Sequence, residues 1–142
     1  MTTAPPVGLF PITQDTVEAA FDWVFASWIK EMGFTDFVVR EGFASMRLPL
    51  NDRLKFFSGA MCGQAIMAAI DTAAAIAAAT GPRVGKGTVY QHTHFLRPAA
   101  NDDVLITATV KRFGRASAYV DCSVTLAGSG ELVAHAVLEF AF

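Results

Sequence analysis

A single carboxylate interrupts an otherwise apolar stretch of the chain. Asp71 lies in the middle of residues 59–80, "GAMCGQAIMAAIDTAAAIAAAT", which otherwise consists mainly of Ala, Ile, Met and Gly. A carboxylate that is partly removed from water becomes more basic, and it can then activate a water molecule or act as a nucleophile. Three arrangements would account for it: a membrane span with a functional acid, a surface helix, or a buried helix that carries a catalytic group.

Two other sets of side chains could carry chemistry. Cys62 stands near the start of the same stretch, where a helix N-terminus could activate its thiol as a nucleophile. No sequence feature places a base beside it, so a small buried hydrophobe is the favoured interpretation. His92 and His94 could begin a metal site, but no third ligand has an evident position, and we interpret both as interface or solvated-face residues. We therefore expect no bound metal.

The composition limits the classes of protein to which the chain can belong. Its 142 residues are 53% hydrophobic and 17% charged, which excludes a disordered chain and predicts one domain with a large core. The net charge of −2, without a basic block, gives no reason to expect nucleic acid as a partner. Two cysteines do not make a disulfide scaffold, and no signal peptide is visible, so we expect a cytoplasmic protein.

The first part of the chain predicts an arm, a helix and a strand. Residues 1–13 contain three prolines and predict an extended arm. A helix is predicted over residues 14–33, with Asp15 and Glu18 as a capping box and Gly33 as its end. Residues 36–50 then predict a strand, with an interruption at Gly42. The apolar face of the predicted helix consists of Val17, Ala20, Phe21, Val24, Phe25, Trp28 and Met32.

The second part of the chain predicts four strands in close succession. They cover residues 88–98, 103–113, 116–126 and 131–142, and short hairpin turns join the last three. Period-two alternation places their apolar side chains on one face of an antiparallel sheet, and residues 59–80 form the only apolar element long enough to cover that face. A membrane span is rejected, since a central Asp costs about 2.5–3.5 kcal/mol on the insertion scale. We expect no membrane partner and a buried helix.

The order of these elements resembles the hotdog fold. The words "FLRPA" (residues 95–99) and "FGRASAYVDCSV" (113–124) resemble that family, and "GELVAHAVLEFAF" (130–142) resembles the ending of acyl-CoA thioesterases of the phenylacetate-pathway type. The resemblance covers residues 36–142. It implies an α+β hotdog fold, with a long central helix wrapped by a curved antiparallel sheet, and the predicted N-terminal helix is extra to it.

The resemblance also implies site residues. In that thioesterase group the long helix begins with His-Gly-Gly, and an acid follows nine positions after the His. On this chain Asp71 is the acid and Gly63 the first Gly, whereas Cys62 stands at the His position and Gln64 at the second Gly. The Asn that often stands six residues before the His is replaced by Phe56. Asp71 and Gly63 are then catalytic, and Cys62, Gln64 and Phe56 contact the substrate.

Thioester hydrolysis needs a donor for the developing oxyanion and a base or nucleophile on the other side of the carbonyl. The N–H of Gly63 has no partner within the helix and lies at its positive end, so it suits the oxyanion. Thr88 matches a strand hydroxyl that, in some members of the family, helps to hold the attacking water. Arg97 and Arg115, in or near loops at strand ends, could bind the phosphates of coenzyme A.

The spacing of Gly63 and Asp71 adds a requirement. Eight residues at about 1.5 Å each separate them by about 12 Å along one helix, so one carbonyl cannot reach both. A productive site then takes Gly63 from one subunit and Asp71 from another, which predicts an obligate homodimer, or a dimer of dimers, with antiparallel helices.

The leading hypothesis is therefore an acyl-CoA thioesterase that needs no cofactor beyond the coenzyme A of its substrate. One alternative is a binding protein that holds an acyl-CoA or lipid without turnover, since three positions depart from the family pattern. A less favoured alternative is an enoyl-CoA hydratase or dehydratase, because no histidine stands in the motif that those families pair with an acid. The acyl group and the carrier, coenzyme A or an acyl-carrier protein, stay open.

Overall fold

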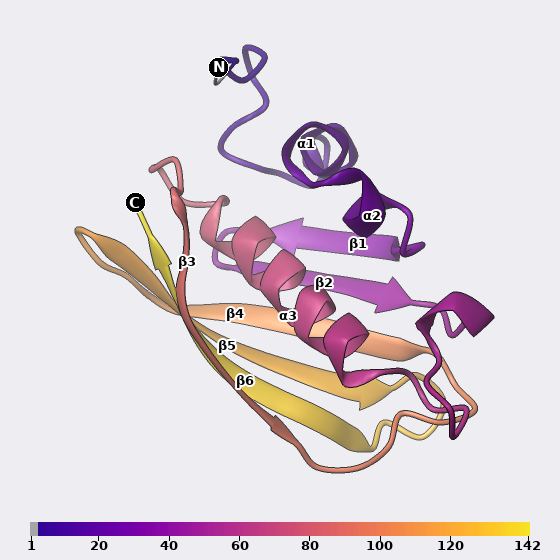
Figure 1. Ribbon diagram of the computed structural model, residues 1–142. Helices are drawn as coiled ribbons and strands as arrows, with labels where there is room; N and C mark the ends of the chain where they lie inside the picture. Colours follow the sequence, from indigo (N-terminus) through magenta and orange to yellow (C-terminus); the bar gives the residue numbers. More distant parts are fainter. Residues whose placement is uncertain (1–2) are drawn as a thin grey trace.

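The structure, a computed structural model, describes residues 3–142 and contains a six-stranded antiparallel sheet in the order β1-β2-β4-β5-β6-β3. The sheet curves around one long helix, α3, and β3 lies at an edge of the sheet (Figure 1). The helices are α1 (Val17–Val24), α2 (Ser27–Lys30), the short 3-10 helix η1 (Asp52–Leu54) and α3 (Gly63–Ala78). The strands are β1 (Thr35–Arg40), β2 (Phe43–Leu48), β3 (Gly87–Phe95), β4 (Val104–Phe113), β5 (Ser117–Leu126) and β6 (Leu132–Ala141). The α+β hotdog architecture expected from the sequence is confirmed.

The central strands owe their register to period-two alternation. In β4, Val104, Ile106 and Ala108 are buried, and the residues between them are more exposed. Their partners in β5 include Val124 and Cys122, which are buried on the same face. This face packs against α3, so the covering role predicted for the long helix is confirmed.

The long helix is enclosed on most of its surface. Its small side chains allow the strands to approach closely, and its buried residues are Ala65, Ile66, Ala69, Ile70, Thr72, Ala73, Ala74, Ile76, Ala77 and Ala78. The helix starts at Gly63, later than the predicted residue 59, because the preceding residues turn back on themselves. The N–H of Phe56 donates to Ala60 O at 3.1 Å, and the N–H of Gly59 donates to Phe56 O at 2.9 Å. Among residues 3–142, no helix combines the length and hydropathy that would let it cross a membrane.

The predicted helix over residues 14–33 is divided into α1 and α2. Phe25 and Ala26 are extended, with ψ of 150° and 152°, and this breaks the helix between them. The break has a packing reason: Ala20 and Ile29 are both buried, yet nine residues at about 3.6 per turn would place them on opposite sides of one straight helix. The predicted capping box is also wrong, because Thr16 is the N-cap and makes no side-chain capping bond.

Polar contacts fix both ends of the first hairpin. The N–H of Gly42, which has a φ of 73° in the turn between β1 and β2, donates to Thr80 Oγ1 at 2.8 Å, beside the end of α3. At the other end of β2, Asp103 accepts hydrogen bonds from Arg47 Nε at 2.8 Å and from the N–H of Leu50 at 2.9 Å. The Leu50 N–H and the Arg47 guanidinium hold the pKa of Asp103 below its usual range. The predicted interruption at Gly42 is confirmed as this turn.

Candidate functional site

Asp71 is half-buried in the middle of α3 and faces the start of β3. The hydroxyl of Thr88, the second residue of β3, donates a hydrogen bond to Asp71 Oδ1. The structure therefore brings together the acid and the strand hydroxyl that the family resemblance suggested. Among the described residues no hydrogen bond engages the second oxygen of Asp71, so that oxygen can accept a proton from a water molecule.

Gly63 begins α3 and borders a cavity of about 360 Å³ on the β3 side of the helix. Its N–H belongs to the first turn, where the helix itself supplies no carbonyl partner. The side chain of Cys62, the N-cap residue, makes no capping hydrogen bond. Phe56, Phe95 and Arg97 line the same cavity. The positive end of the helix dipole at Gly63 favours a carbonyl oxygen that enters this space.

Cys62 and Gln64 lie on another side of the helix start. Both line a separate cavity of about 270 Å³, between α2, η1 and the first turn of α3. The described lining of that cavity holds no histidine, and its one carboxylate, Glu31, lies 3.7 Å from Arg53 Nη2. Successive helix residues point about 100° apart, which explains why Gly63 and its two neighbours border different cavities.

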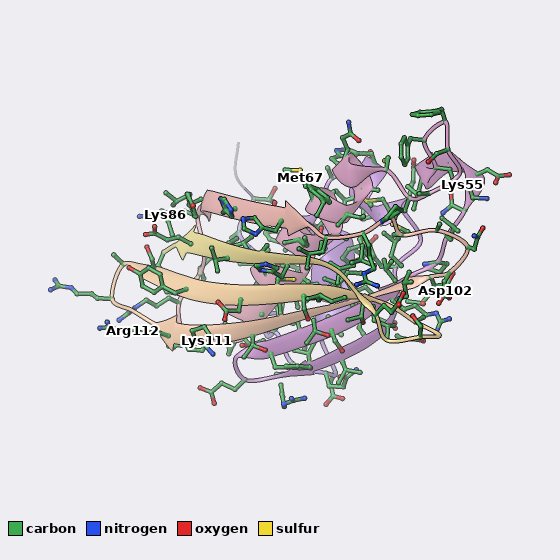
Figure 2. All side chains as sticks on the ribbon, turned by 90° about the horizontal axis from the view of Figure 1, so that it is seen from below. Lys55, Met67, Lys86, Asp102, Lys111 and Arg112 are labelled. Atoms are coloured by element: carbon green, nitrogen blue, oxygen red, sulfur yellow. The ribbon has the colours of Figure 1, made fainter. Side chains whose placement is uncertain are left out.

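The two arginines suggested for phosphate binding lie at opposite ends of the sheet. Arg97 follows β3, borders the Gly63 cavity and forms an ion pair of 3.0 Å with Glu131. Arg115 lies in the turn between β4 and β5. Figure 2 shows Arg112, which is near the β4 end of this turn, on the side of the molecule opposite to Lys55. The strand end next to Arg97 pairs with Ala134 of β6, and the strand end next to Arg115 pairs with Ala141 of β6. These two β6 residues are about 24 Å apart, at about 3.4 Å per residue. One protomer does not bring the two arginines together.

The structure adds Gln91 to the candidate site. Its Nε2 donates to Met67 O at 3.3 Å and to Thr93 Oγ1 at 3.1 Å, so it stands between β3 and α3, midway between Asp71 and Gly63 along the helix. The signal was present in the sequence. Alternation along β3 puts Gln91 and Thr93 on the face opposite to the histidines, where a polar amide next to an apolar helix is unexpected.

The histidines lie on the face of the sheet away from α3. His94 pairs with His135 of β6, which the sequence did not identify as a neighbour, and their ring centroids are 5.0 Å apart. The rings of His92 and His94 are 4.6 Å apart. Within residues 3–142, however, no three histidine, cysteine or acidic side chains are arranged so that they could hold a metal ion. Their outward position agrees with the interpretation as interface or solvated-face residues.

The edge strand β3 carries exposed apolar side chains. Val89 is 62% exposed, Tyr90 53% and Phe95 49%, and Met67 of α3 is 43% exposed beside them. Figure 2 shows Met67 at the margin of the molecule, next to β3. Because an unpaired strand edge with apolar neighbours favours pairing with another chain, this edge is the candidate surface for a second subunit.

Comparisons with known proteins identify relatives of the chain. Residues 58–133 match the sequence family described as the Thioesterase superfamily. A Thermoplasma volcanium protein whose name proposes an esterase is 35% identical over 98 residues, which is 68% of this chain and 74% of that protein.

Solved structures share the fold. The PaaI protein of the E. coli phenylacetic acid degradation operon is 22% identical with a TM-score of 0.78, over 89% of this chain and 90% of that one. A Streptococcus mutans protein solved with acetyl-CoA is 21% identical with a TM-score of 0.71, over 77% of this chain and 87% of that one. The resemblance to the phenylacetate-pathway type of hotdog protein is confirmed at the level of fold and family.

Proposed function

Because the chain belongs to the thioesterase superfamily, we propose that it hydrolyses acyl thioesters of coenzyme A. Asp71 is the general base or nucleophile, and the N–H of Gly63 is the oxyanion donor. The observation that carries the proposal is the hydrogen bond from Thr88 to Asp71. This bond orients a half-buried carboxylate on the side of α3 that faces the start of β3. The acetyl-CoA bound to the Streptococcus mutans neighbour supports coenzyme A as the carrier.

The chemistry follows from the groups present. With Thr88 bonded to one oxygen of Asp71, the other oxygen takes a proton from water, and the hydroxide adds to the thioester carbon. The carbonyl oxygen becomes an oxyanion, which the Gly63 N–H stabilises. When the C–S bond breaks, the oxyanion collapses to the carboxylic acid, and the thiolate takes up the proton from Asp71. In the nucleophilic variant Asp71 itself adds to the carbon and the C–S bond breaks, which releases the thiolate and leaves an anhydride. Water then hydrolyses the anhydride to the carboxylic acid and the Asp71 carboxylate, and the proton released passes to the thiolate.

We propose that two subunits share each site. Gly63 and Asp71 lie about 12 Å apart along one helix, so the donor and the base that act on one carbonyl come from different chains. If the free edges of two β3 strands pair antiparallel about a two-fold axis, the two α3 helices also run antiparallel. Gly63 of one protomer is then brought toward Asp71 of the other, and the exposed apolar residues of β3 become buried.

A binding protein without turnover is the second candidate. It is favoured by one observation: Phe56, rather than a polar amide, lines the Gly63 cavity. An apolar ring there offers no hydrogen bond to a reacting carbonyl, whereas it can pack against a bound ligand.

Release of free thiol from a panel of acyl-CoAs distinguishes the two candidates. We expect the wild type to hydrolyse at least one acyl-CoA, and Asp71→Asn to be slower by about 10²–10⁴-fold, the range for a positioned base. Asp121→Asn is the matched control. Asp121 lies on the outer face of β5 near Lys111, so this substitution removes the same charge at a position away from the site. Full activity of Asp71→Asn would exclude the mechanism, and no hydrolysis by the wild type would favour the binding protein.

A further inference from the structure

A third cavity lies beyond Asp71, between α3 and the N-terminal region. Its volume is about 460 Å³, compared with about 360 Å³ for the cavity at Gly63. The walls come from the N-terminal arm, α1, the second half of α3, the loop before β3, and β6. Aromatic and aliphatic side chains dominate the walls, and none of the described lining residues is charged. Such a space suits an apolar ligand and excludes a charged one.

The cavity adjoins the Asp71–Thr88 pair. Ala75 and Ala79 line it, and they follow Asp71 by one and two helical turns on the same face of α3. On the sheet side the wall is Phe140, which is the register partner of Thr88. Asp71 and Thr88 do not themselves line the cavity, but two of its lining residues, Ala75 and Phe140, lie one helical turn from Asp71 and opposite Thr88 in the strand register.

The N-terminal arm forms one wall of the cavity. The N–H of Ile12 donates to Ala79 O at 2.9 Å, which ties the arm to the end of α3. Phe10 contacts Trp23 of α1 edge to face, with ring centroids 6.3 Å apart. Trp23 lines the cavity and is 41% exposed, so it keeps apolar surface that the protein does not cover. An apolar ligand would cover this surface.

We propose that this cavity binds the acyl group of the substrate, and that the group is an uncharged chain of medium length. The inference rests on the proposed function, which places the thioester carbon at Asp71. From Asp71 to Ala79 the helix rises about 12 Å, which matches an extended chain of roughly eight to ten carbons. Chains that end in a carboxylate are rejected, because the cavity offers no partner for a charge. The acetyl group is too short to reach the cavity.

The first test is the chain-length profile of hydrolysis. We expect kcat/KM to rise from acetyl-CoA to octanoyl-CoA, by up to about fourfold for each methylene that becomes buried. Ala79→Leu fills the far end of the cavity and should lower kcat/KM for decanoyl-CoA at least tenfold, with acetyl-CoA hydrolysis changed less than twofold. The matched control is Ala19→Leu, because Ala19 is exposed on α1 and does not line the cavity. A profile that Ala79→Leu leaves unchanged would overturn the proposal.

The second test does not depend on turnover. The chain has two tryptophans, and only Trp23 lines this cavity, so Trp28→Phe leaves one fluorescent reporter in place. In the doubly substituted protein that also carries Asp71→Asn, decanoyl-CoA should shift the Trp23 emission to shorter wavelength, and acetyl-CoA should not. A shift without hydrolysis by the wild type would support the acyl site and reject the thioesterase. Hydrolysis without a shift would reject the acyl site alone.

Discussion

The N–H of Gly63 can be removed by a substitution that the local backbone tolerates. Proline at the first residue of a helix is favoured, since it lacks an N–H that the helix would leave unpaired in any case. Cys62, the preceding residue, has φ −68° and ψ 149°, which is the extended conformation that a residue before proline requires. Gly63→Pro should therefore fold, and its Tm should equal or slightly exceed that of the wild type.

The expected kinetic effect is large. Loss of one oxyanion donor costs about 10²–10³-fold in kcat, or about 2.7–4 kcal/mol of transition-state stabilisation. Gly63→Ala is the matched control, because it keeps the N–H and its Cβ would lie 3.5 Å from the ring of Phe95, an ordinary contact. Thiol release from the best acyl-CoA should fall at least tenfold more in Gly63→Pro than in Gly63→Ala. Equal activity of the two variants would show that the N–H is not the donor.

The same variant tests whether the site is shared between subunits. Gly63→Pro and Asp71→Asn homodimers each lack one component of both sites. A mixed dimer has one site with both components intact and one with neither. Co-refolding the two variants in equal amounts should therefore restore about a quarter of the wild-type activity, if chains pair at random. If the mixture is no more active than its components, each site is built within one chain.

The remaining predictions concern the orienting hydroxyl, the thiols and an acidic contact. Thr88→Val should lower kcat about tenfold or more through loss of a hydrogen bond to a charged group, and Thr88→Ser should restore most of it; equal kcat values would exclude the orienting role. Burial raises the pKa of the Cys122 thiol to about 12, so iodoacetamide at pH 8 should alkylate Cys62 alone in the native protein and both thiols in denaturant, as mass spectrometry would record. The Cys62→Ala variant should remain active, whereas its inactivity would point to a thiol nucleophile. Asp103→Asn should lose up to about 1 kcal/mol of unfolding free energy at pH 7, measured with urea. Because the pKa of Asp103 lies lower in the folded than in the unfolded protein, this difference should be full above the ordinary value of 3.8 and disappear as the pH falls through the folded value.

The sequence predicted the sheet well because its signal is local. Alternation in segments such as residues 103–113 depends only on which side of a strand each residue faces, and β4 begins at Val104 within one residue of the prediction. The start of α3 was less predictable, since residues 59–62 are as apolar as the helix itself. The backbone bonds of the turn before Gly63, rather than composition, decide where the helix begins.

In the candidate site, too, local features could be predicted from the sequence, whereas features that depend on the folded arrangement could not. Asp71 was conspicuous because a charge in an apolar stretch is visible without a structure. Its hydrogen bond to Thr88 joins residues separated by 17 positions, and only family resemblance suggested it. The rotation of the helix places Cys62 and Gly63 at different cavities. The direction of the strands places Arg97 and Arg115 at opposite ends of the sheet. Neither arrangement can be seen in the sequence alone.

The alanines of α3 have unequal freedom to change in evolution. Ala69, Ala73 and Ala77 are fully buried against the sheet, so any larger residue there would force the strands apart. Ala75 and Ala79 border open space instead, and each could grow by a few carbons without disturbing the sheet. A single nucleotide change from Ala to Val at either position would shorten the space beyond the acid. Homologous chains should therefore keep the three buried alanines and vary at positions 75 and 79. If this space binds the acyl group, as proposed above, each such substitution would change the range of substrates through a single codon.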